Sequence, residues 1–444
     1  MRDSSGCTER PQTSIRPATF PAASPGGPAL RRNATILPLD QGAAAHRKAY
    51  LSGTHRARDP ETTAALIRAH AFELGITRVA NVTGLDYVGI PVTMAVRPAS
   101  RNLSVLQGKG TRVSAALASG LMEALESFCS ERIRELARTD SLRAVDGDGA
   151  CLIPERLVRT APDRDAKIPW TACDDLFGGA GRLAPSEIVF ADFTSPAPAG
   201  QGYFVTTTNG LAAGNTLEEA LIHALCELIE RDATALWRIR ARHGRAAPAL
   251  ALNSIAASEA RGLLSLLDAA KMRVTIWDIT SDLDVPSFWC GIDDVDSGRR
   301  PYLGRFFGTG AHPSADVALC RAIAEAAQSR LTLIAGARDD IDPDLYRWVS
   351  FDDTLPKFFA HPTSAPTIAF EDRSFASESL ARDLDAVLSR LERRGVGRVL
   401  FAPLPGPCEA VACVRAIVAE LEGVAHRAWY RPGPRALALE RALA

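Results

Sequence analysis

Three segments of the sequence combine an almost continuous apolar surface with one narrow line of polar residues. The segments are 115–130, 217–237 and 317–335. Within each segment the polar residues recur at steps of three and four, which places them on one face of an α-helix. A helix at a protein surface has a wide polar face, so these patterns predict three helices that are mostly buried. The polar positions are Ser119, Glu123 and Glu126; Glu219, His223, Glu227, Glu230 and Arg231; and Arg321, Glu325, Gln328, Ser329 and Arg330.

The narrow polar faces are rich in carboxylates. A carboxylate is seldom buried unless it is paired with a cation or bound to a metal. An isolated ExxE pattern is usually a solvated surface feature, but here it recurs among apolar neighbours on separate helices. The sequence therefore predicts an interior cleft in which several acidic side chains meet cations.

Each of these helices follows a short strand-like run and a glycine-containing loop. Gly110, Gly214 and Gly310 stand at similar distances before Glu123, Glu227 and Glu325. This spacing predicts one strand–loop–helix unit that is used three times around a common centre. The fold class that follows is α/β (α+β), with helices packed on mixed sheets around a central cleft.

The remaining elements are predicted from capping residues and from shorter apolar runs. Asp59 is an N-cap and Pro60 a first helical residue, so a helix is expected at 60–74. The first 45 residues are rich in Pro, Ser, Ala and Arg and predict a disordered extension, followed by one domain at 46–440. Further expectations are paired strands around a turn at 85–89, strands at 273–279, 284–292 and 397–404, and helices at 377–394 and 409–421.

Composition narrows the class of protein. The chain has 444 residues, 46% hydrophobic and 23% charged, which is ordinary for a globular enzyme. Its net charge of −1 gives no overall attraction to nucleic acid or to an anionic membrane, so neither partner is predicted. The nine cysteines lack zinc-site spacing and fit a reducing cytoplasm.

Two ExxE pairs, Glu123/Glu126 and Glu227/Glu230, carry the candidate chemistry. Four carboxylates at close range repel one another unless cations lie between them, and oxygen-rich sites suit Mg²⁺. Mg²⁺ usually shares its ligands with substrate phosphates, and amides of glycine loops before helices can bind those phosphates. Arg231 and Arg330 could then neutralise charge on a transferred phosphoryl group. A di-iron bundle is a rival use of helical carboxylates, but the paired ExxH motifs it needs are missing.

Together the three segments resemble the YcaO family. The family motifs are an SxxxExxE helix after a GKG loop, a later NxxxE…ExxER helix, and a third helix with an acid, a Gln and an Arg. The matching residues are Ser119, Glu123 and Glu126; Asn215, Glu219, Glu227, Glu230 and Arg231; and Arg321, Glu325, Gln328 and Arg330. The resemblance covers about residues 46–440.

The resemblance implies an enzyme that binds ATP through Mg²⁺ and phosphorylates a peptide backbone amide. A Cys, Ser or Thr side chain that attacks the activated carbon gives an azoline, whereas external sulfide gives a thioamide. By resemblance, Glu123, Glu126, Glu227 and Glu230 hold Mg²⁺, with Glu230 and Arg231 as catalytic groups. Nucleotide contacts are expected from Ser119, Asn215, Glu219, Glu325, Gln328 and Arg330, and from Arg56 and Thr63 in the N-terminal segment.

Segments 77–92 and 324–340 look like the subgroup that works with a TfuA protein and is linked to thioamides. The C-terminal RPGPRA lacks the PxPxP tail of many azoline-forming relatives, which also favours thioamidation. The expected partners are a TfuA-like protein, a peptide or protein substrate and a sulfide donor, and a homodimer is one compatible assembly. Two alternatives stay open: an azoline-forming cyclodehydratase, and a non-catalytic accessory protein that only binds nucleotide.

Overall fold

The three segments with narrow polar faces fold as predicted, each as a helix that follows a strand. The computed structural model describes residues 47–133, 136–147, 151–246, 248–294, 303–341, 367–423 and 430–444. The expected extension at 1–45 therefore lies outside the described residues. The three units are β3 (Val105–Lys109) with α2 (Val113–Ser130), β7 (Leu211–Gly214) with α5 (Leu217–Arg242), and β10 (Arg305–Ala311) with α7 (Ala315–Ala335).

Each unit contributes its strand to a different antiparallel sheet. In the first sheet β3 pairs with β2 (Val92–Val96), which pairs with β1 (Arg78–Asn81). In the second, β10 pairs with β9 (Ser287–Asp294), which pairs with β8 (Met272–Asp278). The third has the order β4 (Arg138–Ser141), β5 (Lys167–Asp175), β11 (Leu400–Leu404), β12 (Ala412–Ile417), β7, and β6 (Arg182–Pro185) also pairs with β5. The predicted α/β class is thereby confirmed.

Glycine lets each strand lie against its own helix. A Cβ at Gly108 of β3 would come within 2.1 Å of backbone atoms of α2, and one at Gly214 within 2.4 Å of the Ala220 nitrogen of α5. A Cβ at Gly308 of β10 would lie 2.3 Å from the Ala326 nitrogen of α7. Strand and helix therefore approach each other more closely than any side chain would allow. This contact fixes how far each helix stands from the centre.

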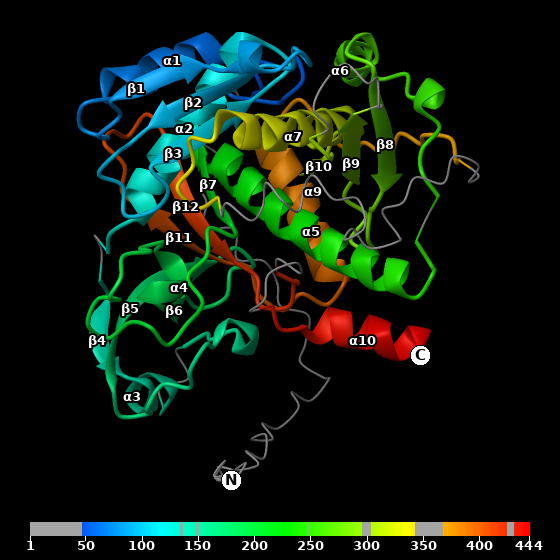
Figure 1. Cartoon of the computed structure of the whole chain (residues 1–444). Coiled ribbons are helices and arrows are strands. Elements are labelled where there is room, and N and C mark those ends of the chain that lie inside the picture. The colour runs from blue at the N-terminus through cyan, green and yellow to red at the C-terminus, as the bar shows by residue number, and fades with distance from the viewer. Residues whose placement is uncertain are drawn as a thin grey trace, which may run out of the picture.

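Helices α2, α5 and α7 lie close together in the middle of the molecule (Figure 1), and polar residues of all three line one cavity. Helix α5 lies centrally and packs against β7, β12, β10, α9 (Leu380–Arg393) and α10 (Pro434–Leu443). Helix α1 (Pro60–Ala69) packs on α2, and α6 (Ser258–Ala269) on α7. The short helices α3 (Leu142–Gly147) and α4 (Ser186–Val189) lie beside the third sheet, near β4 and β5. Among the described residues, no helix has the length and apolar character that a membrane crossing requires.

Most of the smaller elements also agree with the sequence. Asp59 caps α1 and accepts a hydrogen bond from the Thr62 amide, although the helix ends at Ala69 rather than at residue 74. The strand pair around residues 85–89 is confirmed as β1 and β2. Strands β8, β9 and β11 and helix α9 lie within a few residues of their predicted positions.

The helix predicted at 409–421 is wrong, because the middle of that segment, Ala412–Ile417, is strand β12. The strand lies between β11 and β7 and pairs antiparallel with both. All of its residues except Ala412 are buried, including Arg415, whose guanidinium donates to the backbone oxygens of Val189, Thr207 and Asn209. The sheet thus supplies long-range hydrogen bonds that outweigh a local helical preference.

Candidate functional site

The three helices enclose a cavity of about 230 Å³ with the N-terminal segment and the loop after β3. Most of the predicted site residues line it. Helix α2 contributes Ser119, Glu123 and Glu126; α5 and the residues before it contribute Asn215, Glu219, His223, Glu227, Glu230 and Arg231; α7 contributes Arg321 and Glu325; and the N-terminal region contributes Arg56 and Thr63. The structure therefore brings together residues that lie more than two hundred positions apart.

Three of the four ExxE carboxylates are held by polar groups outside their own helix. Glu126 Oε1 accepts from the Ala213 amide of β7 at 2.7 Å, and Glu227 Oε2 accepts from the Gly210 amide at 2.9 Å. Glu230 accepts from Thr309 Oγ1 at 2.6 Å and from the Ala311 amide at 3.1 Å, both in β10. In Glu126 and Glu227 one carboxylate oxygen is thus fixed by a backbone amide. Among the described residues, the second oxygen of Glu126 has no hydrogen-bond donor and can meet a ligand in the cavity, whereas Glu227 Oε1 lies 3.6 Å from Arg231.

Burial makes Glu123, Glu126 and Glu230 hard to ionise. It raises the pKa of Glu126 well above its ordinary value, and the charge of Glu123 adds to the effect. The pKa of Glu230 is raised by burial and then by the charge of Glu325. The pKa of Glu123 is raised as well, chiefly by burial. A divalent cation would offset both causes, since it neutralises the repulsion and replaces the lost hydration.

The donor set fits Mg²⁺. The described residues contain no ready group of three or more His, Cys, Asp or Glu that could hold a metal ion. Mg²⁺ in nucleotide sites is commonly held by one or two carboxylates together with phosphate oxygens and water. The Glu123/Glu126 and Glu227/Glu230 pairs each offer such a partial set of oxygen ligands on the cavity wall.

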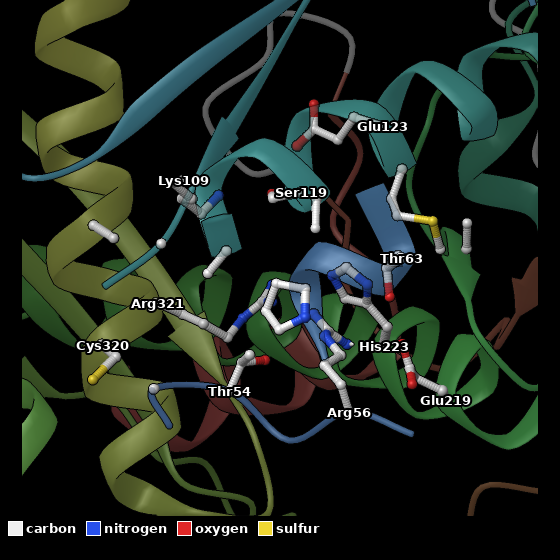
Figure 2. A pocket seen from close by; sticks show the side chains of 18 of the residues that line it. Thr54, Arg56, Thr63, Lys109, Ser119, Glu123, Glu219, His223, Cys320 and Arg321 are labelled. Carbon is white, nitrogen blue, oxygen red and sulfur yellow. Dashed lines mark ion pairs between the residues drawn. The ribbon is translucent and has the colours of Figure 1, made fainter. Parts of the chain in front are cut away.

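Cationic side chains stand beside the carboxylates. Arg231 lies 3.6 Å from Glu227, and Lys109 of the GKG loop lies 3.0 Å from Glu325. Arg321 extends from α7 toward His223 and Arg56 (Figure 2), and its buried Nε has no hydrogen-bond partner among the described residues. Unpaired donors in a cavity are available to an anionic ligand, so this wall is suited to phosphate oxygens.

Arg56 and Thr63 meet the second helix at the opposite side of the cavity. Thr63 Oγ1 donates to Asn215 Oδ1 at 3.0 Å, and Asn215 Nδ2 donates to Glu219 at 3.1 Å. Arg56 lies 3.7 Å from Glu219, which also accepts from the Ala57 amide at 2.8 Å. Figure 2 shows Arg56, Thr63 and Glu219 on the same side of the cavity. Arg56 and Thr63 thus belong to one connected polar network with Asn215 and Glu219.

Two predicted site residues do not line the cavity. Gln328 Oε1 accepts from Lys109, and Gln328 Nε2 donates to the backbone oxygen of Gln107. Gln328 therefore holds the end of β3 in place from outside the cavity. Arg330 is buried on another face of α7, where it pairs with Asp86 at 2.8 Å and Asp294 at 2.9 Å. The position of Arg330 is that of a structural ion-pair centre.

Sequence reasoning missed Lys109 and Thr111 and gave no ligand role to His223 and Arg321. His223 is half-buried in the cavity wall, one turn from both Glu219 and Glu227, and desolvation lowers its pKa well below the ordinary value, with Arg321 the next cause. The imidazole is therefore neutral. A signal for His223 and Arg321 was present, because both lie on the narrow polar faces.

The sequence of the chain is similar to those of known proteins. A family model for YcaO cyclodehydratases, described as ATP- and Mg²⁺-binding, matches residues 107–422. An uncharacterized protein from the tfuA 3′ region of Rhizobium leguminosarum bv. trifolii is 35% identical over 385 residues, which cover 83% of this chain and 88% of that protein. An uncharacterized protein of Methanothermobacter thermautotrophicus is 34% identical over 358 residues, 79% of this chain and 90% of that protein.

Two solved structures share the fold. A heterocyclase in complex with substrate and cofactor superposes with a TM-score of 0.68 at 21% identity over 85% of this chain, which spans only 55% of that heterocyclase. A YcaO protein from Methanopyrus kandleri, bound with AMPPCP and Mg²⁺, superposes with a TM-score of 0.65 at 23% identity. The match covers 88% of this chain and 99% of that protein.

Proposed function

Because the chain belongs to the YcaO family, whose members bind ATP and Mg²⁺, we propose that it uses ATP to phosphorylate a peptide backbone amide. The observation that carries this proposal is the convergence of two ExxE pairs and Arg231 on one cavity. The Methanopyrus kandleri protein of the same fold is bound with AMPPCP and Mg²⁺, which supports a nucleotide in the corresponding cavity.

In this proposal the residues divide into two groups. Mg²⁺, when bound, neutralises the phosphate oxygens of ATP and leaves the terminal phosphorus open to attack. Glu123, Glu126, Glu227 and Glu230 would hold it, and the backbone amides of Ala213 and Gly210 keep two of these carboxylates in place. The rest of the nucleotide would be positioned by Ser119, Asn215, Glu219, Arg56 and Thr63.

Arg231 is the candidate for stabilising the transferred phosphoryl group. It follows Glu230 directly, lies 3.6 Å from Glu227, and its Nε has no partner among the described residues. The amide oxygen of the peptide attacks the terminal phosphorus, ADP leaves, and the amide carbon becomes electrophilic. A second nucleophile then adds to that carbon, and the oxygen departs as inorganic phosphate.

We propose external sulfide as this second nucleophile, so that the product is a thioamide. The support is the relative in the tfuA 3′ region, at 35% identity, together with the resemblance to TfuA-associated members. A TfuA-like protein is the proposed partner. The position of the C-terminal tail also supports a thioamide. Residues 434–443 form α10, which packs on α5, and none of the described residues of α10 lines the cavity.

An azoline-forming cyclodehydratase is the second candidate, favoured by the family description and by the heterocyclase of similar fold. Mass spectrometry of a peptide treated with the chain, ATP, sulfide and a TfuA-like protein separates the two. A thioamide has one oxygen replaced by sulfur and is heavier than the substrate. An azoline has lost one water and is lighter.

The test of amide activation is phosphate release that depends on the peptide. Glu227→Gln keeps the size of the side chain but removes a charge from the cavity, and we expect turnover to fall by about 10²-fold or more. Glu61→Gln, an exposed change on α1, serves as the matched control and should leave turnover unchanged. Equal turnover in Glu227→Gln and wild type would refute the proposal. If the wild-type chain bound ATP but hydrolysed none in the presence of the peptide, the non-catalytic alternative would be favoured instead.

A further inference from the structure

The segment before the first helix, residues 47–58, crosses one wall of the nucleotide cavity. We refer to these residues as the N-terminal strap. Ser52, Gly53, Thr54, Arg56 and Arg58 all line the cavity, so the strap supplies a substantial part of its surface. Only Arg56 among them was predicted to contact the nucleotide. The position of the other residues depends on what holds the strap.

A buried ion pair fixes the beginning of the strap. Lys48 Nζ lies 2.5 Å from Asp383 in the first turn of α9, and each side chain is 1% exposed. The ammonium also donates to the Ser377 backbone oxygen at 2.6 Å, and the Lys48 amide donates to the Glu378 oxygen at 3.1 Å. Asp383 in turn accepts from the amide and the hydroxyl of Ser377. The pair is therefore fully satisfied, as a buried pair must be in order to persist.

Lys48 also reaches the cavity end of the strap. Its Nζ lies 3.0 Å from Nδ1 of His55, the residue before Arg56. Burial, together with the charge of Lys48, lowers the pKa of His55 to about 4, so the neutral imidazole accepts this hydrogen bond. His55 also makes an edge-on contact with His312, and the centroids of the two rings are 5.1 Å apart.

Between these ends the chain forms a closed loop. The Ala49 and Tyr50 amides donate to the Arg56 oxygen, and the Arg56 amide donates back to Tyr50. At the tip, Gly53 has a φ of +67°, and a Cβ there would lie 2.5 Å from the Thr111 side chain of the GKG loop. The tip thus touches the loop after β3, the strand that ends at Lys109.

The loop delivers two groups to Glu219. The Ala57 amide donates to Glu219 Oε2 at 2.8 Å, and Arg56 lies 3.7 Å from the same carboxylate. Arg56 is only about one-quarter exposed, and its partner is 3% exposed. A shift of the strap would therefore move Arg56 and uncouple the network of Thr63, Asn215 and Glu219. None of these contacts involves the ExxE carboxylates directly.

We propose that Lys48 and Asp383 are positioning residues for the nucleotide, which they place by locking the strap across the cavity. The inference rests on the proposed ATP-binding function. It assigns to the pair an effect on nucleotide affinity that is separate from its contribution to folding. The proposed Mg²⁺ ligands and Arg231 lie on α2 and α5, so the rate at saturating ATP should depend little on the pair.

The experiment compares two matched double variants of the full chain. Lys48→Met with Asp383→Asn removes both charges of the pair and leaves no unpaired buried ion. Arg305→Met with Asp293→Asn does the same to a pair whose side chains are 6% and 4% exposed and which does not line the cavity. Binding of Mg-ATP is measured by calorimetry without peptide, and thermal unfolding is measured alongside.

We expect the Lys48/Asp383 variant to weaken Mg-ATP binding by about tenfold or more, while the Arg305/Asp293 variant binds like wild type. In steady-state assays the KM for ATP should rise, with kcat and the KM for peptide within about twofold of wild type. Hydrogen exchange at the Ala49, Tyr50 and Arg56 amides should accelerate only in the first variant. Unchanged Mg-ATP affinity in a folded Lys48/Asp383 variant would overturn the inference alone. Failure of the wild-type chain to bind Mg-ATP would overturn both proposals.

Discussion

Two arginines that the sequence treats alike have different surroundings. Arg231 is about one-third exposed in the cavity wall and has one loose ion pair with Glu227. Arg330 is 2% exposed and satisfies Asp86 and Asp294, which are themselves largely buried. The ring of Tyr87 also lies under the Arg330 guanidinium. These surroundings fit the catalytic role proposed for Arg231, whereas Arg330 forms a structural ion-pair centre.

This contrast predicts that substitution by methionine lowers mainly the stability at Arg330 and mainly the activity at Arg231. Arg330→Met leaves two carboxylates without their cation and should lower the free energy of unfolding by about 3–5 kcal/mol. Arg231→Met should change it by less than about 1 kcal/mol but reduce peptide-dependent phosphate release by about 10²-fold or more. Denaturant unfolding and a phosphate assay on the folded fraction measure the two effects. A stable Arg330→Met protein that has lost Mg-ATP binding would show instead that Arg330 serves the nucleotide.

The helical spacing could have separated these residues in advance. On α7, steps of four, three and four lead from Arg321 to Glu325, Gln328 and Thr332, and Thr332 does contact the Gln107 side chain. Arg330 is not on that line. The location of the carboxylates was predictable because they recur at regular helical spacing. The location of Lys109 was not, since a lysine beside loop glycines belongs to no periodic pattern. Its contacts with Glu325 and Gln328 depend on how two units pack.

At the scale of elements, the strand–loop–helix unit was the most predictable feature of the chain. All three copies appear where the apolar runs and glycines place them. Strand β12 was not predictable, because its short apolar run between Glu409 and Leu421 fits a buried helix as well as a buried strand. The choice is made by β11 and β7, which come from distant parts of the sequence. Local pattern alone carries no information about those partners.

The close contact between strand and helix within a unit leads to a further prediction. Gly108→Ala would place a Cβ within 2.1 Å of the Ala116 oxygen and the Gly120 nitrogen, and backbone atoms cannot move aside cheaply. We expect a loss of about 1–3 kcal/mol or more in the free energy of unfolding. Since α2 must shift, affinity for Mg-ATP should fall as well.

The control is the same substitution at an unhindered glycine. Gly262 lies in α6, and a Cβ there would meet nothing within 4 Å. Gly262→Ala should stabilise the protein by about 0.5–1 kcal/mol, because alanine loses less conformational entropy in a helix. Similar effects of the two substitutions would show that the strand–helix contact is not tightly packed.

At the scale of the whole molecule, two buried carboxylates connect the last helix to the central one. Glu422 accepts hydrogen bonds from Tyr430 and from the amides of Gly433 and Ala436, which lead into α10. Asp232 of α5 accepts from the Glu422 amide and pairs with Arg435 at 2.9 Å. The C-terminal residues are thus tied to the helix that carries Glu227, Glu230 and Arg231.

Asp232 makes this connection sensitive to pH. Burial raises its pKa from 3.8 to about 6, although Arg435 acts in the opposite direction. The folded state therefore holds the proton more tightly than the unfolded chain does. The contribution of Asp232 to stability is largest below the unfolded pKa and is lost as the pH rises through the folded pKa, between about 4 and 6. The loss corresponds to about 3 kcal/mol.

Asp232→Asn removes this titration and keeps the size of the side chain. Denaturant unfolding of the variant and the wild type at pH 4 and pH 7 measures it, because other titrating groups cancel in the difference between the two proteins. We expect that difference to move by about 2 kcal/mol in favour of the variant as the pH rises, less than the full value because the unfolded Asp232 is already partly ionised at pH 4. Since Arg435 keeps a second partner in Asp282, α10 should stay docked in the variant at both pH values. A difference that does not change with pH would mean that Asp232 is ionised in the folded protein at pH 4, and that Arg435 outweighs its burial.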